Sequence, residues 1–200
     1  MIVAKEDLED AELVWWRGGD PSFSSGVPAT LKSGPVGPPF ETRELRNAFG
    51  RFATGVCIVT TRTPEGRTAG LTVNSFTSVS LAPPLVAWCL GRNAPSLKAF
   101  TRASHFAIHV MATDQHSIAM HFARPSPDKF ADLTGEFECG IAQLPVLRSS
   151  LARFECRKAS TLDGGDHLIF IGHVERFAYG DDPPLLFHAG RIVRSGDGPL

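Results

Sequence analysis

The chain lacks an excess of charge of either sign. It carries 20 Lys and Arg against 21 Asp and Glu, which gives a formal net charge of -1 over 200 residues. Such a balance gives no electrostatic reason to expect a nucleic acid or a membrane surface as a partner. Long apolar runs are also missing, since none approaches the ~20 residues that cross a bilayer. The N-terminal stretch "MIVAKEDLEDAELVWW" is acidic and has neither the basic nor the apolar region of a secretory signal.

Cysteine is scarce and scattered. The four cysteines, Cys57, Cys89, Cys139 and Cys156, form no C-x-x-C pair, and three of them lie in apolar, strand-like runs. Free cysteine in such a run behaves as a small buried hydrophobic residue. We therefore expect a protein of the reducing cytoplasm without a structural disulfide.

Several sequence motifs that indicate nucleotide binding or hydrolysis are absent. The sequence has no G-x-G-x-x-G, no G-x-x-x-x-G-K-[ST] and no G-x-S-x-G, so a bound nucleotide must be held in another way and a hydrolytic triad has no support. His105 and His109 are four residues apart, but they lie in a strand-like segment and lack the helical spacing of a zinc pair. We expect no metal site.

Glycine, proline and serine concentrate near the N-terminus. Residues 17–39 consist mostly of these three types, a composition that cannot bury enough apolar area to offset chain entropy. We divide the chain into an irregular arm, 1–40, and a single domain, 41–195. Trp15 and Trp16 leave two interpretations of the arm open: it docks on the domain or on a second subunit, or it is an unattached tail.

The domain is expected to begin with a helix. Leu45, Ala48, Phe49 and Phe52 fall at i, i+3, i+4 and i+7, which places them on one helical face. Thr42 is the expected N-cap, because its hydroxyl can accept a hydrogen bond from a free main-chain N–H of the first turn.

Strands outnumber helices in the rest of the domain. Further helices are expected at 94–102 and at 113–123, the latter capped by Thr113, and residues 124–149 are expected to be loop-like. The β-rich runs are 55–61, 67–76, 83–90, 105–111, 151–160, 167–177 and 184–193. They are joined by turns or short helices, without the regular strand–helix alternation of a doubly wound sheet. The pattern favours a mainly β fold, a closed or nearly closed antiparallel barrel with peripheral helices.

The segment "GLTVNSFTSVS", residues 70–80, is unusually polar for a strand. With a period of two, one face carries Thr72, Asn74, Phe76, Ser78 and Ser80. Two interpretations remain open. The polar face lies in water, or its hydroxyl, amide and main-chain groups form the wall of a ligand site.

A second feature is "DGGDH", residues 163–167. Gly164 and Gly165 favour a tight hairpin turn, but a turn alone requires neither Asp166 nor His167. The histidine is therefore either incidental or a functional residue at the end of a strand.

Four segments together resemble a known family. "FGRFATGVCIVTT", "GLTVNSFTSVSLAPPLV", "PDKF" and "DGGDHLIFIGHVE" occur in this order, followed by "PLLFHAGRI". This set is similar to the flavin reductase-like family with the FMN-binding split barrel, and to the reductase components of two-component flavin monooxygenases. The resemblance covers about residues 43–193. It implies a six-stranded antiparallel split barrel, a homodimer with flavin near the subunit interface, FMN or FAD as cofactor, and NADH or NADPH as hydride donor.

The resemblance also implies site residues. His167 is the expected catalytic residue near the nicotinamide, with no general acid or base assigned. Cofactor contacts are expected from Ala69, Gly70, Leu71, Thr72, Asn74, Ser75, Cys89, Leu90, Gly91, Ser96, Lys98, His121, Phe122, Gly165, Asp166 and His167. Ser96 and Lys98, at the start of the helix at 94–102, correspond to the phosphate end, where free main-chain N–H groups favour an anion. Two positions depart from the family: His121 stands where arginine is frequent, and Ile192 where an aromatic residue is.

The function implied is reduction of a flavin that then leaves for a partner flavin-dependent monooxygenase. Two alternatives come from other classes: a carrier that binds flavin without reducing it, and a split-barrel flavoenzyme that acts directly on an organic substrate. The complete "GGDH" turn argues against a carrier, because a carrier needs no nicotinamide site.

Overall fold

The structure is a computed structural model, and it describes residues 34, 37–131, 133 and 135–194. The chain divides into two compact units, 1–46 and 47–200, and the following description concerns the second unless stated otherwise. Most of the arm predicted at 1–40, including Trp15 and Trp16, lies outside the described residues.

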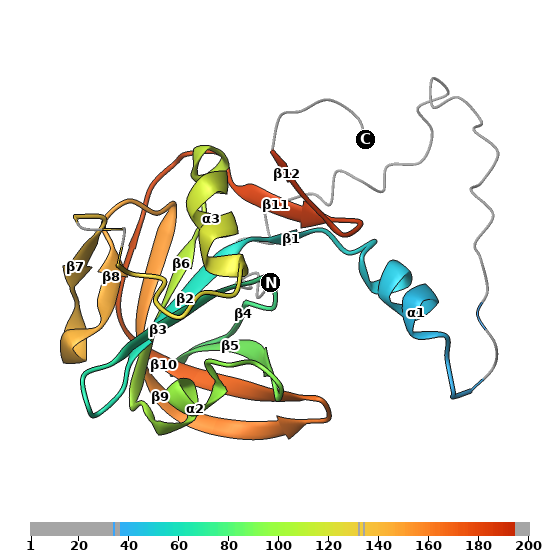
Figure 1. The fold of residues 1–200 in the computed structure, drawn as a ribbon, viewed down its shortest axis with the longest axis horizontal. Coiled ribbons are helices and arrows are strands. Elements are labelled where there is room, and N and C mark those ends of the chain that lie inside the picture. Colours follow the sequence, from blue (N-terminus) through green and yellow to red (C-terminus); the bar gives the residue numbers. More distant parts are fainter. Residues whose placement is uncertain (1–33, 35–36, 132, 134, 195–200) are drawn as a thin grey trace, which may run out of the picture. The chain divides into compact units, whose positions relative to one another are not determined.

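The element order is shown in Figure 1. The helices are α1 (Thr42–Phe49), α2 (Leu97–Arg102) and α3 (His116–Ala123), with short 3₁₀ turns η3 (Thr113–Gln115) and η4 (Ile141–Gln143). The strands are β1 (Thr54–Gly55), β2 (Cys57–Arg62), β3 (Thr68–Val73), β4 (Thr77–Leu81), β5 (Pro84–Gly91), β6 (His105–Val110), β7 (Phe137–Cys139), β8 (Pro145–Leu147), β9 (Ala152–Gly164), β10 (His167–Tyr179), β11 (Leu185–His188) and β12 (Arg191–Arg194).

The fold is mainly β and antiparallel, as the sequence predicted. The largest sheet has the order β3-β2-β6-β9-β10-β5-β4, and two small sheets are formed by β1-β11-β12 and β7-β8. All strand pairs of the large sheet are antiparallel. The large sheet counts seven strands where six were expected.

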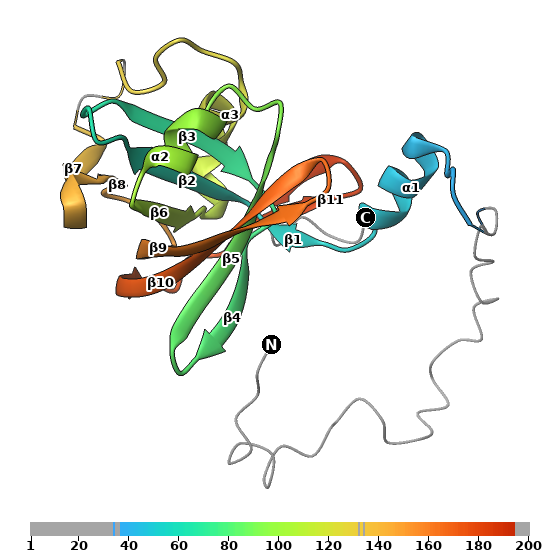
Figure 2. The ribbon, with the colours of Figure 1, turned by 90° about the horizontal axis from the view of Figure 1, so that it is seen from below.

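The two edge strands of the large sheet are neighbours in sequence. β3 ends at Val73 and β4 begins at Thr77, although five strands separate them in the sheet. With strands about 4.8 Å apart, a flat sheet would place its edges about 29 Å from each other. Four residue steps reach at most about 14 Å. The sheet must therefore curl until its two edges approach, and Figure 2 shows this curvature.

The strand β2 is buried on both faces, which explains the almost continuous apolar run in its sequence. Cys57 and Val59 belong to a cluster inside the curl, where Trp88 stacks on Phe170 with ring centroids 4.8 Å apart. Ile58 belongs to a second cluster. Successive side chains of a strand point to opposite faces, so both faces of β2 need apolar cover.

The second cluster is covered by α3. It includes Met111, Ala119, Phe122 and Leu185. Both α2 and α3 contact β2 and β3, so the two longer helices of this unit lie next to the strand pair that contains the start of the polar segment (Figure 1).

Some predicted boundaries were wrong. The first main-chain bond of α1 runs from the Leu45 N–H to the Glu41 carbonyl, so Glu41 rather than Thr42 is the cap, and α1 ends before Phe52. Thr113 is the first residue of η3, and Ala112 precedes it as the cap.

The segment 70–80 is not one strand. Asn74, Ser75 and Phe76 interrupt it, and the two pieces occupy opposite edges of the sheet. The face assignment based on a period of two therefore does not continue from β3 to β4. The region 124–149, predicted to be loop-like, also contains the short hairpin of β7 and β8.

Neither a membrane-spanning helix nor a metal cluster is found in the described part of the chain. No helix there is long and apolar enough to cross a bilayer. No three His, Cys, Asp or Glu side chains in the same part are grouped to hold a metal ion. The four cysteines are free thiols.

Candidate active site

The site residues predicted from the sequence lie on five elements and the connections between them. Ala69, Gly70, Leu71 and Thr72 are in β3, Asn74 and Ser75 in the link to β4, Cys89, Leu90 and Gly91 at the end of β5, Ser96 and Lys98 at the start of α2, His121 and Phe122 in α3, and Gly165, Asp166 and His167 at the β9–β10 turn. Their side-chain contacts fall into two groups, one between β3 and α3 and one at the end of β5.

The β3–α3 group is held by close packing. Thr72 Oγ1 donates a hydrogen bond to the Ala119 carbonyl of α3 at 2.6 Å. A Cβ placed on Gly70 would lie 2.7 Å from Cε1 of Phe122, so α3 can approach β3 this closely only because residue 70 has no side chain. Thr72 and Gly70 thus have structural roles in seating α3, whatever their role toward a ligand.

The opposite side of β3 faces the core inside the curl. Ala69 and Leu71 pack against the cluster that contains Leu90, and Leu90 is 2% exposed. With its side chain enclosed, Leu90 can offer a ligand only main-chain atoms.

The end of β5 is joined to the β3–β4 link by one hydroxyl. Ser75 Oγ accepts a hydrogen bond from the Cys89 N–H at 3.0 Å and donates one to the Cys89 carbonyl at 3.2 Å. β4 pairs with β5 no further than Thr77 opposite Ala87. Beyond that point the Ser75 hydroxyl takes the place of β4 as the hydrogen-bond partner of the β5 main chain. Burial raises the pKa of the Cys89 thiol, which keeps the thiol protonated and unsuited to act as a nucleophile.

The strand register brings His167 next to Gly91. The two residues are paired across β10 and β5, and a Cβ placed on Gly91 would lie 3.7 Å from His167 Nε2 and 3.1 Å from Asn93 Oδ1. The absence of a side chain at Gly91 therefore lets an imidazole and a carboxamide lie close to the main chain of β5. Asn93 was not singled out from the sequence.

Asp166 fixes the proton position on His167. Its Oδ1 lies 2.7 Å from His167 Nδ1, and a carboxylate can only accept, so Nδ1 carries the hydrogen and Nε2 is left on the side of Gly91. The same hydrogen bond from His167 holds the pKa of Asp166 below its ordinary value. The imidazole is about half exposed, with 48% of its side-chain surface accessible, which suits contact with a ligand that comes and goes.

Ser96 and Lys98, the predicted phosphate end, lie at the start of α2. Ser96 is the N-cap of α2, and its side chain makes no capping hydrogen bond within the helix. Lys98, two residues further on, is exposed. Both side chains are therefore held in place by α2, and α2 does not use their polar atoms for its own hydrogen bonds.

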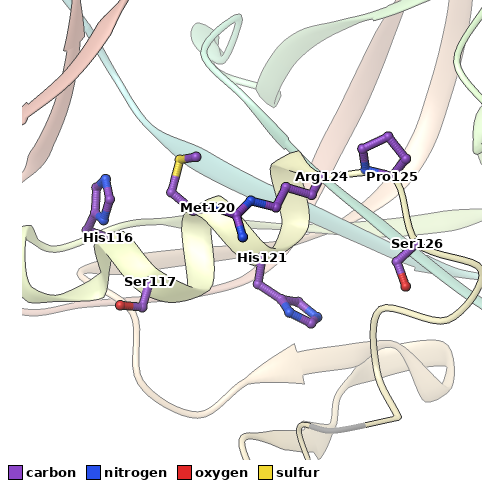
Figure 3. A pocket seen from close by; sticks show the side chains of 7 residues that line it. All are labelled: His116, Ser117, Met120, His121, Arg124, Pro125 and Ser126. Atoms are coloured by element: carbon purple, nitrogen blue, oxygen red, sulfur yellow. The ribbon is translucent and has the colours of Figure 1, made fainter.

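An open hollow of about 530 Å³ lies along α3. It is lined by residues of α3 and of the segment after it, namely His116, Ser117, Met120, His121, Arg124, Pro125 and Ser126 (Figure 3). His121 Nε2 lies 2.8 Å from the Lys129 carbonyl, to which it donates. Arg124, which the sequence analysis did not select, adds a guanidinium to the same hollow, and this set of side chains favours an anionic group.

Most of the chain matches a known domain family. The model of the flavin reductase like domain matches residues 49–196. The FMN reductase (NADH) SmoA of Agrobacterium fabrum is 47% identical over 153 residues, which are 76% of this chain and 86% of that protein. The reductase component of the flavin-dependent trigonelline monooxygenase of Acinetobacter baylyi is 41% identical over 74% of this chain, but the match spans only 47% of that longer protein.

Solved structures agree with this result. The Streptomyces globisporus NADH:FAD oxidoreductase SgcE6, in complex with NAD and FAD fragments, superposes with a TM-score of 0.71 at 37% identity, over 78% of this chain and 94% of that one. The match of the domain model covers well over half of the present chain. The chain therefore belongs to the flavin reductase-like domain family.

Proposed function

We propose that this protein is an NAD(P)H-dependent flavin reductase that passes reduced flavin to a partner flavin-dependent monooxygenase. The observation that carries the proposal is the pairing of His167 with Gly91, which puts the "GDH" turn beside the end of β5. Relatives described as an FMN reductase (NADH), a monooxygenase reductase component and an NADH:FAD oxidoreductase support it. Their descriptions favour NADH as the hydride donor and leave both FMN and FAD as candidate flavins.

The residues present fit a flavin and a nicotinamide. Gly91 has no Cβ, so a flat ring can approach the main chain at the end of β5 closely, beside His167 and Asn93. Ser75 holds this main chain in place through Cys89. When bound, the flavin supplies the hydride-accepting chemistry, and the nicotinamide supplies the hydride.

The protein's own contribution is binding and orientation. We assign His167 to the nicotinamide end, where its Nε2 accepts a hydrogen bond from a carboxamide N–H. We assign Ser96 and Lys98 to the phosphate end. Holding the two rings at reacting distance removes the entropy cost of a bimolecular encounter from the chemical step. In a site without an acid or base in place, this is the main way in which the protein can accelerate the reaction.

We further propose that the curled sheet is the split barrel of the family and that the domain spans 41–195. The three-residue link between β3 and β4 supports closure, because it needs both edges of the sheet close together. The four free cysteines support the predicted cytoplasmic location.

We also propose a homodimer. Leu81 at the tip of the β4–β5 hairpin is 75% exposed, and Phe177 and Tyr179 on β10 are 63% and 76% exposed. β10 pairs with β5 as far as His173 opposite Leu85, so this tip and the last residues of β10 lie toward the same end of the sheet. Light scattering during gel filtration tests the proposal: a mass of one chain contradicts it.

The deciding experiment is NADH oxidation followed at 340 nm with added FMN or FAD, for the wild type and for His167→Ala. We expect turnover that depends on added flavin in the wild type and a loss of at least tenfold in kcat/KM for NADH in the variant, which corresponds to about 1.4 kcal/mol of transition-state stabilisation. Tightly bound flavin without turnover would identify a carrier. An unchanged variant would refute the assignment of His167.

A further inference from the structure

Arg92 holds the β9–β10 turn from outside the hairpin. This residue follows β5 directly, and its main-chain N–H donates to the Asp166 carbonyl at 2.9 Å. Its side chain donates from Nε to the Gly165 carbonyl at 2.8 Å and from Nη2 to Asp163 Oδ2 at 2.8 Å. One residue thus contacts three of the four positions that precede His167.

Asp163 completes the arrangement from within the turn. Its second oxygen, Oδ1, accepts the Gly165 N–H at 3.1 Å, and Gly165 has a φ of +76°, a conformation that glycine adopts readily. The hydrogen bond from Arg92, and after it the one from the Gly165 amide, lowers the pKa of Asp163. The carboxylate is therefore charged at neutral pH and bridges the guanidinium and the turn.

Apart from the strand pairings that end at Gly164 and His167, little else defines the position of the turn. Every residue from 159 to 167 is exposed, so apolar packing does not hold the end of this hairpin. Exposed ion pairs contribute little to global stability. A forked guanidinium fixes direction more than it adds stability, because two of its donors point along fixed axes. The contacts of Arg92 are therefore suited to defining where the turn lies.

We propose that Arg92 is a positioning residue for His167. Through Gly165 and Asp163 it fixes the turn, and the turn places the imidazole over Gly91 for the nicotinamide of the incoming hydride donor. Arg92 itself does not touch the reacting atoms. The part of this proposal that concerns NADH rests on the proposed function; the part that concerns the turn does not.

The primary test is steady-state kinetics of Arg92→Ala and Arg92→Lys. Both variants retain the main-chain bond to Asp166, which limits any general effect on the hairpin. A displaced imidazole no longer accepts the hydrogen bond from the nicotinamide carboxamide, so we expect the KM for NADH to rise about tenfold in Arg92→Ala. Arg92→Lys retains the charge toward Asp163 but loses the forked guanidinium that also bonds the Gly165 carbonyl. Its KM for NADH is therefore expected to lie between those of the wild type and Arg92→Ala. The dissociation constant for flavin should stay within about twofold.

Arg102→Ala is the matched control. The Arg102 side chain is as exposed as that of Arg92, at 44%, and also pairs with one carboxylate, Glu65. It contacts the β2–β3 turn rather than the β9–β10 turn. If both alanine variants change the KM for NADH equally, the effect comes from loss of an exposed arginine and the proposal is wrong.

A double variant separates positioning from an independent role. In Arg92→Ala/His167→Ala, the change at Arg92 should have no further effect on the KM for NADH, because its only route to the nicotinamide has been removed. A further tenfold rise would show that Arg92 acts without His167 and would overturn the proposal.

A measurement without substrate distinguishes this proposal from the proposed function. Backbone NMR relaxation of the Gly165 and Asp166 amides reports motion of the turn. We expect both order parameters to fall in Arg92→Ala and to be unchanged in Arg102→Ala. If the wild type does not oxidise NADH, the proposed function fails, and the relaxation data still decide whether Arg92 fixes the turn: unchanged order parameters in Arg92→Ala refute it.

Discussion

Gly70→Ala is the substitution whose effect follows most directly from the structure. The added methyl group would lie 2.7 Å and 3.0 Å from two ring carbons of Phe122, and 3.3 Å from Cζ of Phe130. Carbon atoms in favourable contact are about 3.5–4.0 Å apart, so the Phe122 ring would have to move by roughly 1 Å. It has no room to do so, since it is fully buried and packs edge-on against Phe130 and Phe137.

Two opposing effects set the size of the change. Overpacking of a rigid core typically costs about 1–3 kcal/mol. Replacing glycine by alanine within a strand returns about 0.5–1 kcal/mol, because the unfolded chain loses conformational freedom. We expect a net loss of about 1–2 kcal/mol in the free energy of unfolding at Gly70. In a domain of this size that lowers Tm by roughly 2–8 °C.

The assay is urea and thermal unfolding of the wild type, Gly70→Ala, Phe122→Leu and the double variant. Phe122→Leu is destabilising by itself because it leaves a cavity, but it also makes room for the methyl group. The double variant should therefore be more stable than the sum of the single effects predicts, by 1 kcal/mol or more. Additive losses, or a Gly70→Ala protein as stable as the wild type, would refute the packing role of Gly70.

Three further predictions concern pH and the β3–β4 link. Burial lowers the pKa of His109 from 6.5 to about 4, so the stability contributed by the neutral ring is complete above pH 6.5. It is lost as the pH falls from 6.5 to 4, about 3 kcal/mol in all. Urea unfolding of the wild type should show this fall in the free energy of unfolding, and the same fall in His109→Gln would contradict this origin. Ser75→Ala removes both hydrogen bonds to Cys89, and we expect flavin affinity, measured by fluorescence quenching, to fall about tenfold. Asn74→Trp places a bulky group on the exposed link; we expect weaker flavin binding, and unchanged affinity would favour the interpretation of a face in water.

The hairpins were predictable because their information is local. The run 167–177 is rich in β-branched and aromatic residues and follows a double glycine, and the structure pairs β9 with β10 across that turn. The same is true of β2 and β3, which pair around the turn at 64–66. Turn residues and adjacent periodic segments lie close together in sequence, so their pairing needs no knowledge of the rest of the fold.

The contacts of Arg92 could not be predicted in this way. Arg92 and Asp163 are 71 positions apart, and they meet because β5 and β10 are neighbours with Gly91 opposite His167. A shift of the register by one residue would turn both side chains to other partners. The sequence indicated the turn, therefore, and not the residue that fixes it.

The segment 70–80 shows why periodicity alone was misleading. A period of two assumes one continuous strand, but residues 74–76 cross between the two edges of a curled sheet and leave the ladder. Main-chain groups next to such a crossing lose their strand partners and need others, because an unpaired buried N–H or carbonyl is costly. Ser75 supplies both partners for Cys89.

The polar residues of this segment therefore have different roles. Thr72 seats α3 and Ser75 replaces a missing strand, while the exposed Asn74 has neither task. Small size is required at Gly70 by the Phe122 ring and at Gly91 by the imidazole and carboxamide beside it. If the flavin lies along the end of β5, Asn74 is the one of these three residues whose side chain remains free to contact it, since the structural roles of Thr72 and Ser75 already use their hydroxyls. Substitutions at Asn74 should accordingly change flavin affinity without changing stability, whereas substitutions at Thr72 should change stability first.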